Sequence, residues 1–171
     1  MKRPLPNEHP AYYQKYIDLI SSDDILKVLD QQIIQILELI SRISEEKENY
    51  RYAEGKWTPK EVIGHIIDTE RIMAYRALRF ARKDKTPLAG FDENSYVEHA
   101  NFNNTSIYDL AHSFGLVRES NISLFNHFDE SALNEIGNAN GNAVSVRAML
   151  FMIAGHTAHH INIIKEKYLN E

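Results

Sequence analysis

The chain has 171 residues, of which 43% are hydrophobic and 25% are charged, and its formal net charge is −5. This length favours a single domain, residues 1–171, with a sizeable core. The acidic balance and the lack of a densely basic stretch argue against nucleic acid as a partner, although one local basic group would be enough to bind a small anionic substrate.

Cysteine is absent, so disulfides, thiolate metal ligands and a cysteine nucleophile are all excluded. Any site for a soft metal must therefore use histidine and oxygen ligands. The N-terminal sequence has no apolar run of the kind found in signal peptides. No other segment approaches the ~20 apolar residues that span a bilayer. We therefore expect a cytoplasmic protein with no membrane partner.

Residues 1–20 contain three of the five prolines and three of the nine tyrosines, which predicts an arm packed on the body by its aromatic side chains. The first long helix is predicted from Ser22 to Ser44, because apolar residues recur there at helical spacing. The apolar stripe comprises Ile25, Leu29, Ile33, Ile36, Leu37, Ile40 and Ile43.

The second helix has the clearest boundary in the chain. Thr58 occupies the N-cap position, Pro59 fits the first turn because its missing N–H would have no partner there, and Glu61 completes a capping box. The sequence predicts that this helix continues to about Lys83.

The linker after the second helix, residues 84–104, is too long for a simple helical hairpin turn. Its aromatic residues indicate that it packs against the body. A third helix is predicted from Ser106 to Phe128, and a fourth from Ser145 almost to the C-terminus. The loop between them contains Asn138, Asn140, Gly141 and Asn142.

These elements predict an all-α fold, a four-helix bundle. The long linker can cross the bundle, which would leave helices two and three parallel and helix four antiparallel to helix two. At ~1.5 Å per residue, His65 then lies ~9 Å from the start of helix two, and His160 lies ~14 Å from the end of helix four. Antiparallel packing would therefore bring histidines of the two helices to a similar depth.

Three histidines form the strongest candidate site. His156 and His160 are four residues apart, so they share one face of a helix and can both point at one ion. His65 from a neighbouring helix would complete a facial set of metal ligands with positions left for water. The residue after His156 is Thr157, so the glutamate base of an H-E-x-x-H metalloprotease is absent. The alternative is a group of core histidines satisfied by hydrogen bonds, or an exposed pair.

Asp68 lies one turn after His65 and is the candidate for a supporting role in catalysis. A carboxylate in this position could orient a histidine ligand or accept a hydrogen bond from a metal-bound water. The alternative is a solvated carboxylate, or an ion-pair partner of Arg71 or Arg76.

His159 is expected at the edge of the histidine face, because each residue turns a helix by ~100°. Trp57, just before the capping box, is expected to be a core anchor. Three further histidines show no ligand spacing and are predicted to lie on the surface or at an interface: His99, His112 and His127. The small residues Ala154, Gly155 and Ala158 predict close packing within the bundle, while a homodimer through this face is also compatible.

A resemblance to known proteins is carried by four stretches: YAEGKWTPKEVIGHIIDTERIMAYRALRFAR, PLAGFDENSYV, ANFN and GNAVSVRAMLFMIAGHTAHHINII. Together they resemble the DinB/YfiT-like family of metalloenzymes over about residues 20–170. The most specific parts are the histidine of helix two, which follows K-W-T, and the G-H-x-x-H-H element of helix four.

The resemblance implies an up-down-down-up bundle with a long crossover between helices two and three. It also implies one divalent metal ion, nickel or zinc, on a triad that falls on His65, His156 and His160. Several relatives are S-transferases or isomerases that use a low-molecular-weight thiol such as bacillithiol, mycothiol or glutathione. Others are described as hydrolases.

We therefore expect a metal-dependent enzyme acting on a small-molecule substrate, either a thiol-dependent S-transferase or a hydrolase. Because the chain has no cysteine, any reacting thiol would come from a cofactor. One alternative is a non-catalytic metal- or ligand-binding stress protein. Another is a structural bundle whose histidines bind metal adventitiously.

Overall fold

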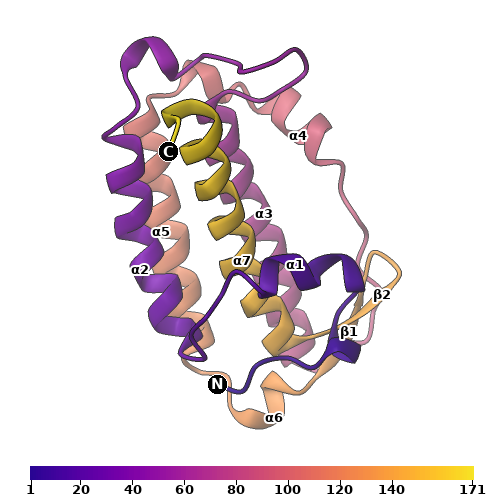
Figure 1. Cartoon of the computed structure of the whole chain (residues 1–171). Coiled ribbons are helices and arrows are strands. Elements are labelled where there is room, and N and C mark those ends of the chain that lie inside the picture. Colours follow the sequence, from indigo (N-terminus) through magenta and orange to yellow (C-terminus); the bar gives the residue numbers. More distant parts are fainter.

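Four long helices run side by side in the computed structural model, which describes residues 1–171 (Figure 1). They are α2 (Ile25–Ile40), α3 (Pro59–Ala81), α5 (Ile107–Phe125) and α7 (Val146–Ile164). The predicted all-α four-helix bundle is therefore confirmed. None of the helices combines the length and the apolar character that are needed to cross a membrane.

The helices follow an up-down-down-up order: α2 and α7 run in one direction, and α3 and α5 run in the other (Figure 1). The main packing pairs are α3 with α7, α2 with α5, α3 with α5, and α2 with α7. The consecutive helices α2 and α3 thus lie on a diagonal of the bundle. The crossover between α3 and α5 carries the short helix α4 (Glu93–Ala100).

The start of α3 follows the predicted capping box. The Thr58 hydroxyl accepts a hydrogen bond from the Glu61 N–H at 3.2 Å, and the Glu61 carboxylate accepts one from the Thr58 N–H at 2.8 Å. The helix begins at Pro59 and ends at Ala81, close to the expected Lys83. This boundary could be predicted because all of its determinants lie within four consecutive residues.

The first long helix, predicted over residues 22–44, is shorter in the structure. The Asp24 carboxylate accepts a hydrogen bond from the Lys27 N–H and begins α2 later than expected. At the other end, the Ser41 hydroxyl donates to the Glu38 carbonyl oxygen at 2.8 Å, and such bonds compete with continuation of a helix. Local polar side chains therefore explain both shortened ends.

The predicted arm, residues 1–20, packs against α7 and contains the short helix α1 (Gln14–Ile17). The Glu8 carboxylate accepts hydrogen bonds from the Ser145 hydroxyl at 2.8 Å and from the Arg147 guanidinium at 2.7 and 2.8 Å. Burial raises the pKa of Glu8, but these hydrogen bonds outweigh burial and lower the pKa below its ordinary value. An ion pair therefore ties the arm to the start of α7.

Gly155 on α7 allows the arm to approach closely. A Cβ atom at this position would lie 2.2 Å from the Tyr16 carbonyl oxygen, so the backbone would have to shift. The neighbouring Ala154 carbonyl oxygen accepts a hydrogen bond at 2.8 Å from Gln32 Nε2 on α2. The close packing predicted for these small residues is therefore confirmed, although the partner of Gly155 is the arm and not another long helix.

The segment predicted as a loop between helices three and four contains a β-hairpin. Strands β1 (Ile136–Ala139) and β2 (Asn142–Ser145) pair antiparallel around Asn140 and Gly141, whose φ angles are 52° and 76°. Two consecutive residues with positive φ are characteristic of the tight turn that Asn-Gly favours. Leu88 in the crossover also pairs with the end of β1, so the crossover is tied to the hairpin.

Several short elements complete the chain. Helix α6 (Glu130–Leu133) lies between α5 and β1, and a π-helical turn at Lys165–Leu169 extends α7 almost to the C-terminus, as predicted. Short 3₁₀ turns lie at Pro6–Glu8, Ala11–Tyr13, Glu45–Lys47 and Phe102–Asn104.

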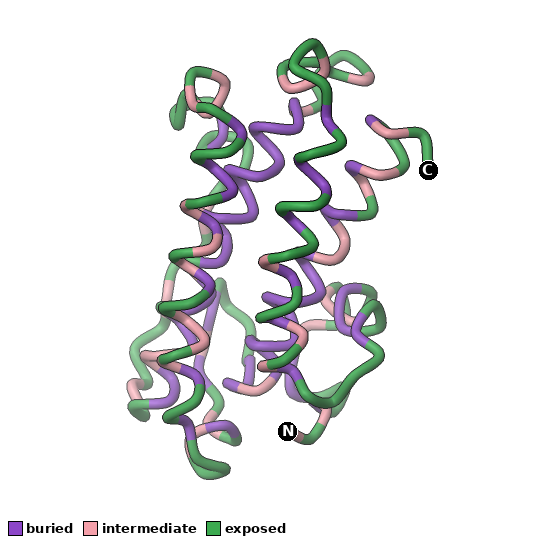
Figure 2. Tube along the Cα trace, turned by 90° about the vertical axis from the view of Figure 1, so that its left-hand side faces the viewer, coloured by how far each residue is buried: buried purple, intermediate pink, exposed green.

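Buried residues lie mainly on the inward faces of the long helices (Figure 2), and the apolar ones form two clusters. One cluster lies around the end of α3 and the start of α7, and it includes Phe80 and Phe151. The other lies around the start of α3 and the end of α7, and it includes Ile63 and Ile161. The core therefore has two apolar ends.

A buried polar network lies between the two clusters and joins all four helices. Arg118 of α5 is fully buried, and its guanidinium donates to both carboxylate oxygens of Glu70 on α3 at 2.8 Å. It also donates to the Leu29 carbonyl oxygen at 2.9 Å and to the Gln32 side chain at 2.7 Å, both on α2. The Thr157 hydroxyl of α7 accepts a further bond at 3.0 Å. Every long helix thus contributes to one buried charge or its partners.

Replacing Arg118 with methionine should lower the free energy of unfolding by about 3–5 kcal/mol, because Glu70 would remain buried without its counter-charge. Adding Glu70→Leu to this variant should recover part of the loss. Arg71 is the control, since it is exposed and paired with Asp68, and Arg71→Met should cost about 1 kcal/mol or less. Urea unfolding measures all three; equal losses for the two single arginine variants would contradict this prediction.

Candidate metal centre

The three predicted histidines converge through their Nε2 atoms. His156 Nε2 lies 3.0 Å from His65 Nε2 and 3.1 Å from His160 Nε2. His65 lies near the start of α3, and the other two lie in the second half of α7, so antiparallel packing brings them to one level. No carboxylate belongs to the group.

Burial keeps the three imidazoles neutral. Each histidine is only 7–8% exposed. Burial lowers the pKa of His65 from 6.5 to about 4. Burial first, and then the charges of neighbouring histidines, lower the pKa of His156 and His160 well below 6.5. At neutral pH each ring therefore has an unprotonated nitrogen, which is the form that binds a metal.

Two side chains hold the His65 ring. Thr69 Oγ1 lies 3.4 Å from His65 Nδ1, one turn further along α3. The Trp57 ring packs against the His65 ring with centroids 4.6 Å apart. The Trp57 carbonyl oxygen in turn accepts a hydrogen bond from the Tyr168 hydroxyl near the C-terminus. The anchoring role predicted for Trp57 therefore extends to a residue of the candidate site.

Asp68 pairs with Arg71, which is one of the alternatives that the sequence left open. The two side chains lie 3.4 Å apart, and no hydrogen bond joins Asp68 to a histidine. Burial raises the pKa of Asp68, while Arg71 opposes this effect. The polar side chain beside His65 is Thr69, which the sequence reasoning missed although its i+4 position was an available signal. A supporting role for Asp68 stays a prediction.

The remaining histidines that were considered lie outside the group, as predicted. His159 is half-buried, and its ring packs edge-on against Tyr16 of the arm with centroids 5.1 Å apart. The other three are exposed: His99, His112 and His127.

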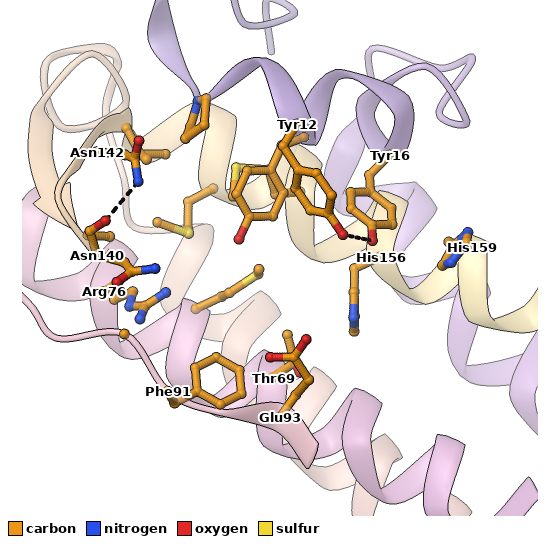
Figure 3. A pocket seen from close by; sticks show the side chains of 18 of the residues that line it. Tyr12, Tyr16, Thr69, Arg76, Phe91, Glu93, Asn140, Asn142, His156 and His159 are labelled. Carbon is orange, nitrogen blue, oxygen red and sulfur yellow. Dashed lines mark hydrogen bonds between the residues drawn. The ribbon is translucent and has the colours of Figure 1, made fainter. Parts of the chain in front are cut away.

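The histidine group lines a cavity of about 530 Å³. The arm contributes the Tyr12 and Tyr16 rings, whose hydroxyls lie 3.1 Å apart, and Tyr16 packs against His156 (Figure 3). Arg76 and Asn140 lie toward the end of the cavity away from His156 (Figure 3). The candidate metal ligands therefore face a space that is large enough for a small molecule.

The fold and the histidine group define a four-helix-bundle protein with a candidate metal centre. Residues 29–164 match the family model described as the DinB superfamily, and the chain belongs to that superfamily. A protein of Oceanobacillus iheyensis, provisionally named a metal-dependent hydrolase, is 27% identical over 146 residues, which cover 82% of this chain and 81% of that protein.

Three solved structures share the fold. YfiT from Bacillus subtilis, described as a probable metal-dependent hydrolase with an unusual four-helix bundle topology, has a TM-score of 0.80 at 15% identity, with 86% of each chain covered. A mycothiol-dependent maleylpyruvate isomerase has a TM-score of 0.67 at 15% identity, covering 85% of this chain and 61% of that one. The DinB-like protein YjoA of Bacillus subtilis has a TM-score of 0.59 at 19% identity, with 87% and 93% covered.

Acidification should destabilise the metal-free protein. The pKa values of His65, His156 and His160 are lower in the folded chain than the ordinary value of 6.5 that applies after unfolding. Stability is therefore fully present above pH 6.5 and falls as the pH drops toward about 4, where His65 becomes protonated in the folded state. In this range, each imidazole lowers the free energy of unfolding by up to about 1.4 kcal/mol for each unit by which the pH falls.

Urea unfolding across this pH range measures the dependence. The variant His156→Gln should show a shallower slope than the wild type, because one buried imidazole no longer takes up a proton on unfolding. His112→Gln, at an exposed position on α5, is the matched control and should retain the wild-type slope. If His156→Gln and the wild type had the same slope, the buried neutral imidazoles would not be the cause of the loss of stability at low pH.

Proposed function

We propose that this chain is a metal-dependent enzyme in which His65, His156 and His160 hold one divalent ion, nickel or zinc, for the reaction of a small-molecule substrate. The observation that carries the proposal is the convergence of three neutral Nε2 atoms at the wall of a cavity. A cytoplasmic location is part of the same proposal.

The spacing of the nitrogens suits a single ion. Two imidazole nitrogens bound at about 2.1 Å lie about 3.0 Å apart when their bonds are at right angles, and about 3.4 Å apart at the tetrahedral angle. The separations of 3.0 and 3.1 Å from His156 Nε2 agree with the first value.

An ion in this position would lower the pKa of a bound water or thiol and so supply a nucleophile near neutral pH. The residues of the chain perform the other tasks. The three histidines approach from α3 and α7 and leave the cavity side open, while Trp57 and Tyr16 shield the rings of His65 and His156. The substrate would therefore approach from the cavity.

Hydrolysis is the first candidate reaction, because the descriptions of YfiT and of the Oceanobacillus iheyensis protein both refer to metal-dependent hydrolases. Thiol-dependent transfer or isomerisation is the second, favoured by the shared fold with the mycothiol-dependent isomerase. Since the chain has no cysteine, the thiol would come from a second small molecule. A non-catalytic metal- or ligand-binding stress protein is the alternative of another class, and the cavity beside the histidines favours an enzyme over it.

The variant His65→Ala should lose tight metal binding and activity but keep a folded bundle. The helices still bury many aliphatic side chains, which contribute ~1.5–3 kcal/mol each. Loss of an ion present at a thousandfold excess over its Kd removes about 4 kcal/mol of stabilisation, so the melting temperature should fall. Elemental analysis and thermal unfolding of untagged protein measure both effects, and His112→Ala should bind one ion per chain like the wild type.

Full metal affinity in His65→Ala would show that His65 is not a ligand. Complete unfolding of this variant would show that the ion is structural, and the enzymatic proposal would then be abandoned. Zinc- and nickel-loaded protein should next be assayed with ester and amide substrates alone, and with electrophiles plus a thiol. Turnover without thiol supports hydrolysis, turnover only with thiol supports transfer, and tight metal binding without turnover in either assay supports the non-catalytic alternative.

A further inference from the structure

Arg76 is a buried cation at the end of the cavity away from His156 (Figure 3). Only 6% of the residue is exposed. Its guanidinium donates one hydrogen bond, to the Ala89 carbonyl oxygen at 2.7 Å, and lies 6.0 Å from the centre of the Phe91 ring. Burial lowers the pKa of Arg76 below its ordinary value, because the charged form is poorly solvated there. Most of its donors therefore lack a protein acceptor.

Two other arginines, Arg118, which is buried, and Arg147, which is partly buried, each have a carboxylate partner. Arg118 pairs with Glu70 at 2.8 Å, and Arg147 pairs with Glu8 at 2.7 Å. Arg76 is also buried, yet its one hydrogen-bond acceptor is a neutral carbonyl oxygen, and no ion pair joins it to a carboxylate. A buried charge without a partner is costly, so an anion that entered the cavity would be bound favourably.

We propose that Arg76 binds the carboxylate of the substrate at the end of the cavity away from the histidines. The inference rests on the proposed function and adds the substrate class to it: a small acid whose reactive group lies at the histidine end. The guanidinium suits this role because its planar fork can donate two parallel hydrogen bonds to one carboxylate.

The charges that line the cavity favour a single negative charge on the ligand. Arg76 is the one arginine or lysine among the lining residues, and Glu93 also lines the cavity. A phosphate ester carries close to two negative charges at neutral pH, by analogy with a phosphorylated side chain. Arg76 could neutralise only one of these charges, and the second would remain without a cationic partner in a cavity that also contains the Glu93 carboxylate. A monocarboxylate therefore fits this site better than a phosphate.

The cavity is also lined by apolar side chains. Its lining includes the thioether side chains of Met73, Met149 and Met152. Flexible thioether side chains suit apolar groups of varied shape. The substrate class is therefore an acid with an apolar body, such as an aryl- or alkyl-substituted carboxylic acid.

The backbone around Arg76 orients its side chain before a ligand binds. The Leu88 N–H donates to β1, and the Asn140 N–H donates back to the Leu88 carbonyl oxygen, both at 2.9 Å. This pairing fixes the adjacent Ala89 carbonyl oxygen, which accepts the hydrogen bond from Arg76. Gly90 permits the crossover to lie close to the hairpin, because a Cβ atom at this position would lie 2.4 Å from Asn140 Oδ1. The crossover and the hairpin together thus form the wall behind the guanidinium.

Calorimetric titration with 3-phenylpropionate, its neutral amide and 2-phenylethyl phosphate tests the inference. Metal-free protein is used because carboxylates also bind metal ions. The acid should bind about 10-fold or more tightly than the amide, because only the acid makes charge-assisted hydrogen bonds to Arg76. Arg76→Met should remove this preference, and Arg76→Lys should retain part of it. Arg71→Met changes an exposed arginine of the same helix outside the cavity and should behave like the wild type.

Measurements on the wild type alone can overturn the inference: they would do so if acid and amide bound with equal affinity, or if the acid did not bind. An unchanged preference in folded Arg76→Met, or tighter binding of the phosphate than of the acid, would also overturn it. Zinc content is measured separately and should be the same in Arg76→Met as in the wild type. A protein that binds the acid but no zinc would contradict the proposed function alone, while one that binds zinc without preferring the acid would contradict this inference alone.

Discussion

The buried ion pair between Arg118 and Glu70, together with the hydrogen bond from Arg118 to Thr157, fixes how α3 and α7 lie against each other, and the geometry of the histidine group depends on that placement. Arg118 also binds Thr157, the residue that follows His156, while Glu70 lies little more than one turn after His65. A shift of either helix along its axis would therefore break its bond to Arg118 and, at the same time, move the Nε2 atoms of the histidine group apart. The network stabilises a bundle in which the consecutive helices α2 and α3 lie on a diagonal, and it holds two faces of the candidate site in register.

The histidine group could be predicted because its determinants are local or follow from one topological inference. The four-residue spacing of His156 and His160 places both on one helical face, whatever else the chain does. The capping box of Thr58 and Glu61 fixes where α3 begins, and hence the depth of His65 in the bundle. The long crossover then sets the relative direction of the helices. Two local signals and one topological inference therefore converge on one site.

Other features depend on contacts between distant parts of the chain, which no local pattern encodes. The approach of the arm to Gly155 and the missing carboxylate partner of Arg76 become visible only when the whole fold is assembled. The hairpin is a different case, because Asn140-Gly141 is a strong local turn signal between two short strands. Thr69 is also marked by a local signal, because a residue four positions after a histidine faces the same side of the helix, whereas the charge of Asp68 is no guide to contact with His65.

The most direct test of the account is X-ray absorption spectroscopy at the zinc edge of the zinc-loaded protein. Three imidazole nitrogens at ~2.0–2.1 Å, with the remaining coordination supplied by a ligand from outside the chain, are the expected result. The imidazole signal should weaken in His160→Gln, which removes one of the three rings of the group. Zinc bound without imidazole scattering, or closed by a fourth protein ligand, would contradict an open three-histidine centre facing the cavity.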